Sequence, residues 1–189
     1  MKTIEISKQE MSKRVARYAD LDPLPIQTDS GIPLEITDQF SARELLSVIG
    51  LDTAGETPIN AGAPITGAGG MTITIARCPA GQGPALHAHN QTYETFTVLK
   101  GRFEITWNDE GDESIILEQF DTMSVPPGVC RAFRNVSDQE GLLQVVITGG
   151  VHDMSDIDMS PLVGEMLERE GYIDKFKGVG YTFTAGIPD

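Results

Sequence analysis

Two histidines and a glutamate lie close together near the middle of the chain, at His87, His89 and Glu94. The whole sequence holds only three histidines, so two of them share this short segment. Imidazole nitrogens and a carboxylate form a ligand set that suits Fe, Mn, Ni or Zn. Two His and one carboxylate on one side of an ion leave its other side open for water, O₂ or a substrate, as in the non-haem iron facial triad. The residue types therefore predict a divalent transition-metal site.

The spacing of these residues indicates which elements must position them. His87 and His89 are two residues apart, so on a strand both imidazoles lie on one face. Glu94 follows His89 by five residues and would face the other way on an unbroken strand. A turn at Asn90–Thr92 is therefore required, and these residue types favour one. After that turn Glu94 meets the histidine pair, and Phe96 lies behind it on the same face.

The surrounding sequence has the apolar period of short strands. Between about Met71 and Gly150, apolar and polar residues alternate in the runs 71–75, 95–98, 102–107, 114–117, 122–125 and 142–148. Turn-forming residues separate several of these runs, at 108–112, 126–128 and 137–141. Several short strands with turn signals at this spacing predict an all-β sandwich or barrel.

The two ends of the chain differ from this central stretch. We divide a single domain into an N-terminal arm with short helices at 1–66, a barrel at 67–150 and a C-terminal helical tail at 151–189. Capping-box patterns at Ser7–Glu10 and Ser41–Glu44 predict two helices in the arm, the first running toward Tyr18 and the second stopping at Gly50.

The tail has its own helix signal. Ser160 followed by Pro161 is typical of an N-cap and first helical residue, which predicts a helix from Pro161 to about Glu170. Leu162, Met166 and Leu167 would be available to pack on the barrel.

The segment Gly81-x5-His87-x-His89-x4-Glu94-x6-Gly101 resembles the first motif of the cupin superfamily at every fixed position. The resemblance covers roughly residues 71–150. It implies a double-stranded β-helix, which is a jelly-roll-like barrel. The expected architecture is thus an all-β cupin barrel with a partly helical N-terminal arm and a C-terminal helix.

A second cupin motif is only partly matched. Pro126, Gly128 and Asn135 stand at its fixed positions, whereas Phe120 replaces a turn glycine. Arg131 replaces the histidine that, in the family, points into the barrel and completes the metal shell. Arginine stays protonated and has no lone pair to offer, so it is not a ligand.

Arg131 leaves three hypotheses open. It could bend away from a metal held by His87, His89 and Glu94. It could bind an anionic substrate group, such as a carboxylate, beside the metal through a bidentate contact. It could instead pair with Glu94 in a metal-free pocket that binds a small anion or a sugar.

Other residues are candidates for the mouth of the site. Gln91, Tyr93 and Phe96 neighbour the ligands and, with Arg131, form the expected substrate-binding set, although Gln91 and Tyr93 are equally well explained as solvated turn residues. His152 is a possible replacement ligand, although a loop histidine is the simpler interpretation. No residue is assigned as a catalytic acid or base.

Composition limits the function classes. The net charge of −14 argues against nucleic-acid and anionic-membrane partners, which require a basic surface. The sequence has no apolar run of membrane-spanning length and no apolar segment typical of a secretory signal near its first residues. Cys78 and Cys130 are interpreted as reduced thiols, which together predicts a cytoplasmic protein.

Two functions remain open at this point. The first is a metal-dependent enzyme acting on a small, acidic molecule, either dioxygenase-like or an isomerase. The second is a small-molecule-binding cupin without turnover, metal-free or non-catalytic, in which Arg131 anchors an anion. A homodimer is expected in either case, because cupin barrels commonly pair and the arm offers an extra strand.

Overall fold

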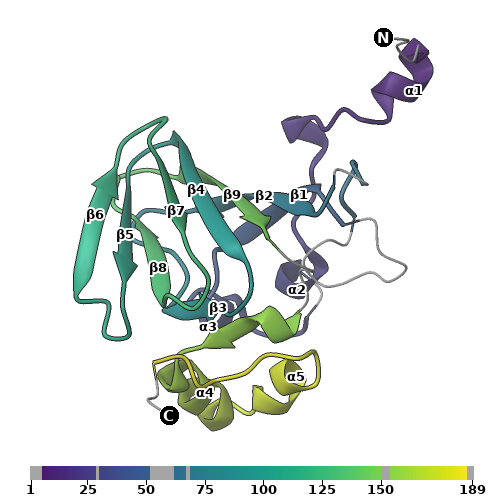
Figure 1. The fold of residues 1–189 in the computed structure, drawn as a ribbon. Helices are drawn as coiled ribbons and strands as arrows, with labels where there is room; N and C mark the ends of the chain where they lie inside the picture. The colour runs from purple at the N-terminus through teal and green to yellow at the C-terminus, as the bar shows by residue number, and fades with distance from the viewer. Residues whose placement is uncertain (1–5, 29, 52–61, 67–68, 150–153, 187–189) are drawn as a thin grey trace.

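The computed structural model describes residues 6–28, 30–51, 62–66, 69–149 and 154–186. Two five-stranded antiparallel sheets face each other and form the barrel (Figure 1). The first has the order β1 (Glu44–Ile49), β2 (Met71–Cys78), β9 (Gly141–Thr148), β4 (Tyr93–Lys100), β7 (Thr122–Val125). The second has the order β10 (Ile157–Met159), β3 (His87–His89), β8 (Arg131–Asn135), β5 (Phe103–Trp107), β6 (Glu113–Leu117). The predicted double-stranded β-helix is confirmed.

The alternating pattern in the sequence becomes alternating burial in the strands. In β2 and β9 every second side chain is buried, as expected for strands with one face on a core. These side chains join the barrel core, whose fully buried members include Phe96, Val98, Phe103, Ile105 and Leu143. Phe133 contacts both Phe96 and Phe103 edge to face.

Short helices precede and follow the barrel strands. The described helices are α1 (Lys8–Ser12), the 3-10 turn η1 (Tyr18–Asp20), α2 (Pro25–Thr28), α3 (Leu34–Thr37), the 3-10 turn η2 (Met154–Asp156), α4 (Pro161–Arg169) and α5 (Ile173–Lys177). No described helix has both the length and the apolar character needed to cross a bilayer.

The first predicted helix begins where expected but is shorter. The Ser7 hydroxyl accepts a hydrogen bond from the Glu10 amide at 3.1 Å, which confirms the N-cap. The helix ends at Ser12 instead of running toward Tyr18, and it has no buried residue. Without an apolar face to bury, a cap alone does not extend a helix, because most helical stability comes from packing.

The helix predicted after Ser41 is wrong, because Glu44–Ile49 form strand β1. This strand pairs with β2 from Glu44↔Arg77 to Ile49↔Ile73. Its residues are mainly leucine, valine and isoleucine, and pairing with a neighbouring strand here outweighs the local capping signal.

The tail helix is confirmed, and its packing partner differs from the expected one. The Ser160 hydroxyl accepts from the Leu162 amide at 3.3 Å, and Pro161 is the first helical residue. Met166 and Leu167 are buried, but Leu162 is 73% exposed, so its predicted packing is wrong. The buried face joins a second hydrophobic core, in which Phe40 from the arm contacts Phe176 from the tail.

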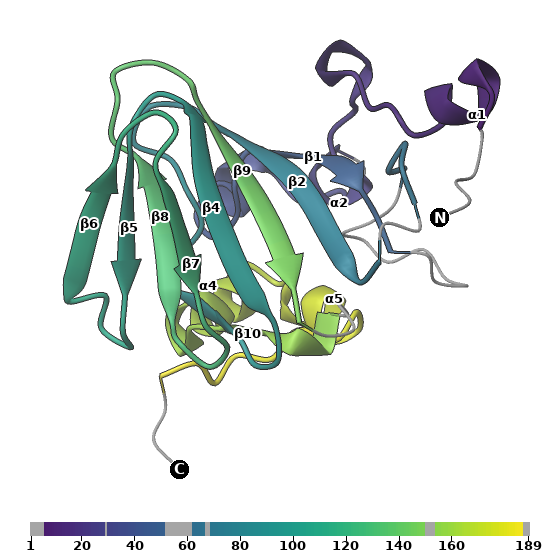
Figure 2. The same ribbon diagram turned by 45° about the horizontal axis from the view of Figure 1, so that its top comes forward.

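Both flanking segments add strands to the barrel sheets. Figure 2 shows β1 beside β2 at one edge and β10 beneath the barrel with α4 and α5. β10 pairs with β3 along its whole length, placing Ile157 opposite His89 and Met159 opposite His87. The tail therefore reaches the strand that carries the two histidines, whereas the arm extends the other sheet.

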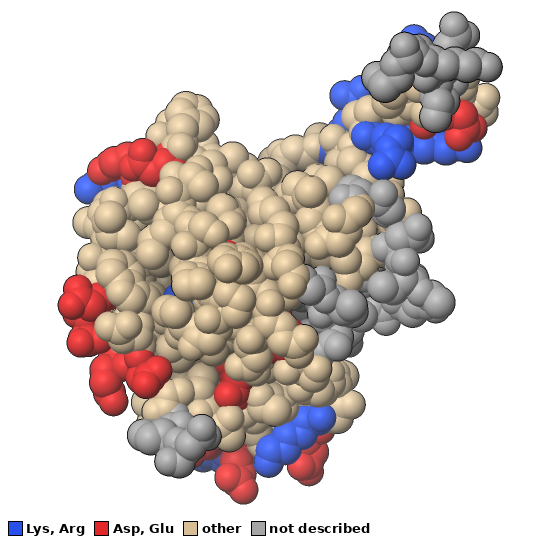
Figure 3. Space-filling model, in the orientation of Figure 1, with Lys and Arg blue, Asp and Glu red and all other residues tan. Residues whose placement is uncertain are grey.

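Charge is unevenly distributed over the surface. On the face shown in Figure 3, acidic side chains gather at the barrel edge beside β6, whereas many of the Lys and Arg side chains lie on the N-terminal segment.

Candidate metal centre

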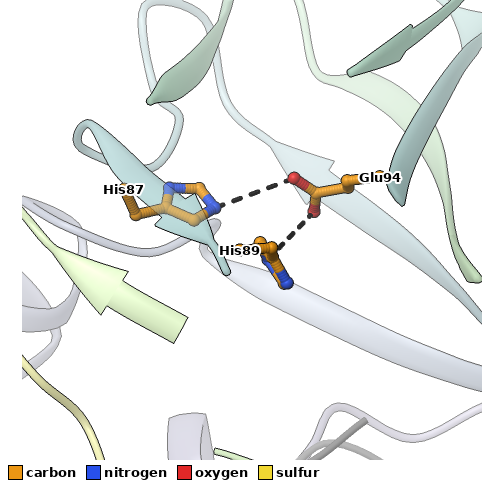
Figure 4. Close-up of side chains that lie close together, drawn as sticks. All are labelled: His87, His89 and Glu94. Atoms are coloured by element: carbon orange, nitrogen blue, oxygen red, sulfur yellow. Dashed lines mark ion pairs between the residues drawn. The ribbon is translucent and has the colours of Figure 1, made fainter. Parts of the chain in front are cut away.

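The three predicted ligands converge inside the barrel. The candidate ligand atoms of His87, His89 and Glu94 all lie within 4.8 Å of one another, and all three residues are buried. Figure 4 shows both imidazoles directed toward the Glu94 carboxylate. The distance from His87 Nε2 to Glu94 Oε2 is 3.8 Å, and that from His89 Nε2 to Glu94 Oε1 is 3.9 Å. These gaps are too long for hydrogen bonds.

The hydrogen bond of His87 decides which ring nitrogen carries its proton. Nδ1 lies 2.9 Å from the Ala85 carbonyl oxygen, which can only accept. Nδ1 therefore donates, and in the neutral ring Nε2 holds the lone pair that faces Glu94.

His89 is oriented by a carboxylate from the tail. Its Nδ1 donates to Asp156 Oδ2 at 2.9 Å, which leaves the lone pair of the neutral ring on Nε2. The Thr92 hydroxyl also donates to Asp156 Oδ2, at 2.5 Å, and Asp156 itself has no exposed surface. A carboxylate behind a histidine ligand is a recurrent feature of metal sites, because it sets the tautomer and strengthens the base.

The same aspartate holds the turn that the ligand spacing requires. Asp156 Oδ1 accepts from the Gln91 amide at 2.6 Å, and its backbone oxygen accepts from the Asn90 amide at 2.8 Å. These bonds fix the turn between β3 and β4. Glu94 is thereby placed on the same side as the two histidines.

Burial and neighbouring charges set the protonation of the ligands. Burial, with help from the Arg131 charge, lowers the pKa of His87 to about 4, so the ring is neutral at pH 7. Burial raises the pKa of Glu94, but Arg131 and the two histidines outweigh it and lower the value to about 2. Hydrogen bonds from His89 and Thr92 hold the pKa of Asp156 below its usual range in spite of burial. The site thus presents a lone pair on His87 and an ionised Glu94 at neutral pH.

Arg131 lies against the ligand set and is fully buried. Its Nε donates to Glu94 Oε2 at 2.8 Å, and its Nη1 donates to the Val129 carbonyl at 3.1 Å. Its Nη2 is buried without a hydrogen-bond partner among the described residues. The Glu94 contact matches the pairing considered in the third sequence-based hypothesis. Glu94 Oε1 takes no part in that pairing and faces His89.

The donor set fits a transition-metal ion. Ligand atoms about 2.1 Å from a tetrahedral ion lie roughly 3.4 Å apart, so small shifts from the present 3.8 and 3.9 Å would suffice. A ligand must carry no proton on the atom that binds the metal. In each neutral imidazole the proton lies on Nδ1, so Nε2 holds the lone pair, and the Glu94 carboxylate is ionised. The buried Arg131 cation opposes a dication and lowers its affinity.

A cavity of about 120 Å³ lies next to the ligands. The three ligands form part of its wall, and the barrel residues Phe133 and Val145 form another part. More than half of the lining residues come from the arm and the tail, among them Leu45 and Phe176.

The remaining predicted site residues lie elsewhere. Gln91 and Tyr93 are exposed, and Phe96 is fully buried in the barrel core. None of these three, nor Arg131, lines the cavity. His152 is outside the described residues. The two cysteines are free and buried, and burial raises the pKa of Cys78 to about 12.

Sequence reasoning missed Asp156 and the cavity walls outside the barrel. Asp156 lies 67 residues after His89 and belongs to no recognisable ligand spacing. The only available signal is that a histidine ligand needs a hydrogen-bond partner on its other nitrogen. That rule says a partner exists without saying which residue it is.

Comparison with known proteins places the central segment in a family. Residues 74–148 match the family model of the cupin domain. No curated protein matches the chain at a significant level.

Solved structures resemble the barrel region at low identity. A cupin protein from Bacteroides fragilis is 28% identical over 43% of this chain and 68% of its own, with a TM-score of 0.39. A protein from Bacillus halodurans is 15% identical over 47% of this chain and 69% of its own, with a TM-score of 0.43. A chain from a structure of DMSP lyases is 18% identical over 62% of this chain and 53% of its own, with a TM-score of 0.48.

Proposed function

This chain belongs to the cupin superfamily through residues 74–148, and on that premise we propose that it is a metal-dependent cupin acting on a small molecule. His87, His89 and Glu94 would hold the ion, and the adjoining cavity would hold the molecule. The single observation that carries the proposal is the arrangement of the two imidazoles. Both Nδ1–H groups are engaged, and both Nε2 atoms face one carboxylate at distances too long for hydrogen bonds.

The ligand set favours redox or Lewis-acid chemistry. A bound ion of this kind would supply either O₂ activation or polarisation of a substrate oxygen. Two His and one carboxylate support a dioxygenase-like enzyme, with an isomerase as the other enzymatic possibility. In both, Glu94 acts as a ligand and not as a base, because its low pKa makes it a poor proton acceptor at pH 7.

Metal analysis tests the proposal most directly. We expect purified protein, reloaded with Fe(II), Mn(II), Ni(II) or Zn(II) and desalted, to retain close to one ion per chain by mass spectrometry. His87→Ala should retain far less, because three-ligand binding then becomes two-ligand binding. The matched control is a wild-type sample treated with chelator and carried through the same steps. Equal metal content in wild type and His87→Ala would overturn the proposal.

Oxygen consumption tests the finer assignment. Fe(II)-loaded protein should consume O₂ in the presence of a turned-over substrate, and the His87→Ala variant should not. Turnover without O₂ consumption would favour the isomerase.

A specific contact favours a second function, a metal-free binding protein. Arg131 already neutralises Glu94 through a 2.8 Å hydrogen bond, so the buried carboxylate is paired without an ion. Arg131→His separates the two functions. In a metal enzyme this change removes the opposing cation and adds an imidazole beside His87, since the two residues are register partners, and metal affinity should rise about tenfold or more. If the protein is instead metal-free, adding metal should leave the melting temperature of the wild type unchanged.

Three further expectations remain proposals. The acidic substrate anchored by Arg131 is less favoured, since the Arg131 Nε is paired with Glu94 and Arg131 does not line the cavity. The homodimer is testable by light scattering, where a mass near that of one 20.4 kDa chain would contradict it. The cytoplasmic location is testable by cell fractionation.

A further inference from the structure

The wall of the cavity beside the candidate metal centre is mainly apolar. Barrel, arm and tail all contribute apolar side chains to it, including Leu24, Phe40, Val145, Ile157 and Phe176. Such walls contribute to binding by removing apolar ligand surface from water. Apolar side chains cannot replace the hydration of a charged group.

Charge around the cavity is almost fully balanced. None of the lining residues is Lys or Arg, and Glu94 is the one acidic residue among them. Arg131 neutralises Glu94 from behind the wall. Burial raises the pKa of Tyr181, so this lining phenol stays uncharged. In the metal-free protein, a ligand anion would therefore enter this cavity without a lining cation to meet it.

Two of the polar side chains on the arm side of the wall, Gln27 and Thr37, already make hydrogen bonds within the protein. The Gln27 amide nitrogen donates to the Ala42 carbonyl, and its oxygen accepts from the Leu45 amide, both at 2.6 Å. The Thr37 hydroxyl donates to the Leu34 carbonyl at 3.1 Å. The histidines and Glu94 line the same cavity and can meet the polar end of a ligand.

Volume limits the size of the ligand. An apolar protein cavity of about 150 Å³ accommodates benzene. The cavity here, of about 120 Å³, is of the same order and suits a molecule of roughly five to seven non-hydrogen atoms.

We infer that the cavity selects a small, uncharged, predominantly apolar molecule with one polar end, and that the arm and tail impose this selection. The inference deepens the proposed function and rests on the same site, but the selection is a property of the cavity walls and is present without metal. In the metal-free cavity an acid of the same shape is disfavoured, because its carboxylate loses hydration and finds no partner charge.

A matched pair of probes tests this selection. 3-Methylbutanamide and 3-methylbutanoate have the same shape and seven non-hydrogen atoms each, and they differ in an uncharged amide against a carboxylate. Binding is measured at pH 7.5 by ligand-detected saturation-transfer NMR and calorimetry, on full-length protein with excess chelator. We expect the amide to bind at least tenfold more tightly than the carboxylate. Equal or tighter binding of the carboxylate, or no binding of either, would overturn the inference.

Variants locate the binding. Ala42→Leu enlarges a lining side chain and should weaken amide binding at least tenfold, whereas Ala19→Leu makes the same change at an exposed position and should leave binding unchanged. Near-ultraviolet circular dichroism checks that each variant is folded. If Ala42→Leu does not fold, saturation transfer from the Phe40, Phe176 and Tyr181 rings to the amide in wild type locates the ligand instead. Transfer absent from all three rings would contradict binding in this cavity.

The outcomes separate this inference from the proposed function. Wild-type protein that retains no metal but prefers the amide overturns the metal centre and supports the cavity selection. Wild-type protein that retains metal but shows no preference for the amide supports the metal centre and overturns the cavity selection.

Discussion

The two hydrophobic cores of this protein are built by different parts of the chain and serve the site in different ways. The barrel core consists almost entirely of side chains from strands between β2 and β9. The second core joins α3 and Phe40 of the arm to β10, α4 and α5 of the tail. The barrel carries all three candidate ligands, whereas the arm and tail carry most of the cavity wall and the carboxylate that orients His89.

This difference separates the chemistry of the site from its specificity. The ligand set lies within the segment that matches the cupin domain. Most of the cavity wall and the carboxylate that orients His89 come from segments outside that match. A change in the arm or tail should therefore alter what binds and how tightly, while a change in the barrel ligands should remove metal binding itself.

The largest effect is expected from breaking the buried pair in the barrel. Glu94→Gln leaves the Arg131 cation buried without a partner charge, and we expect the free energy of unfolding of the metal-free protein to fall by about 3–5 kcal/mol. Urea denaturation measures this. Glu118→Gln breaks the exposed pair with Arg102 and is the matched control, with an expected loss of at most about 1 kcal/mol. Equal losses in the two variants would show that the pair is not buried as described.

The next effect tests the contribution of the tail. Asp156→Asn removes the charge behind His89, and metal affinity should fall about 10- to 100-fold, because the ring is less basic and less firmly oriented. Competition with a chromophoric chelator measures the affinity. Asp174→Asn changes an exposed tail aspartate and is the control.

Nitrogen-15 NMR of the imidazoles gives a second measurement on the same variant. In metal-free wild type His89 should be protonated on Nδ1, and Asp156→Asn should shift its tautomer populations. Unchanged tautomer and affinity would place all control of the ligands within the barrel.

A pH series probes the barrel ligands without metal. The folded state keeps His87 neutral down to about pH 4, whereas the unfolded chain protonates it below about pH 6.5. The unfolded state therefore binds more protons in this window, and stability falls as the pH drops. Between pH 7 and pH 5 the loss attributable to His87 is about 2 kcal/mol. His87→Asn should lack this component, and identical pH profiles for variant and wild type would contradict it.

The smallest change in the free energy of unfolding is expected from removing the N-caps of two helices in the flanking segments. Ser160→Ala removes the cap of α4, which packs in the second core, and should cost about 1 kcal/mol. Ser7→Ala removes the cap of α1, which has no buried residue, and the free energy of unfolding should stay within about 0.5 kcal/mol of wild type. Thermal unfolding of both variants measures the difference, and a larger loss for Ser7→Ala would show that α1 is packed.

Local sequence patterns were sufficient to predict the barrel and the convergence of its three candidate ligands. Strand periodicity predicted most barrel strands, because burial on one face imposes a period of two. The spacing of His87, His89 and Glu94 predicted their convergence, because a turn of suitable residues restores the common face. Ser160 and Pro161 predicted α4, because a cap acts on its own helix.

The tertiary structure alone decided how distant segments complete the site. Residues 44–49 became a strand because β2 was available to pair with them, which no local signal reports. Asp156 reached His89 because β10 pairs with β3, and Arg131 met Glu94 across the barrel interior. Capping and periodicity act between neighbours in sequence, whereas charge pairing, hydrogen bonding to ligands and cavity walls depend on contacts between residues far apart along the chain. The sequence by itself therefore determined the candidate ligand set, and the folded structure determined its orientation, its charge balance and the apolar space beside it.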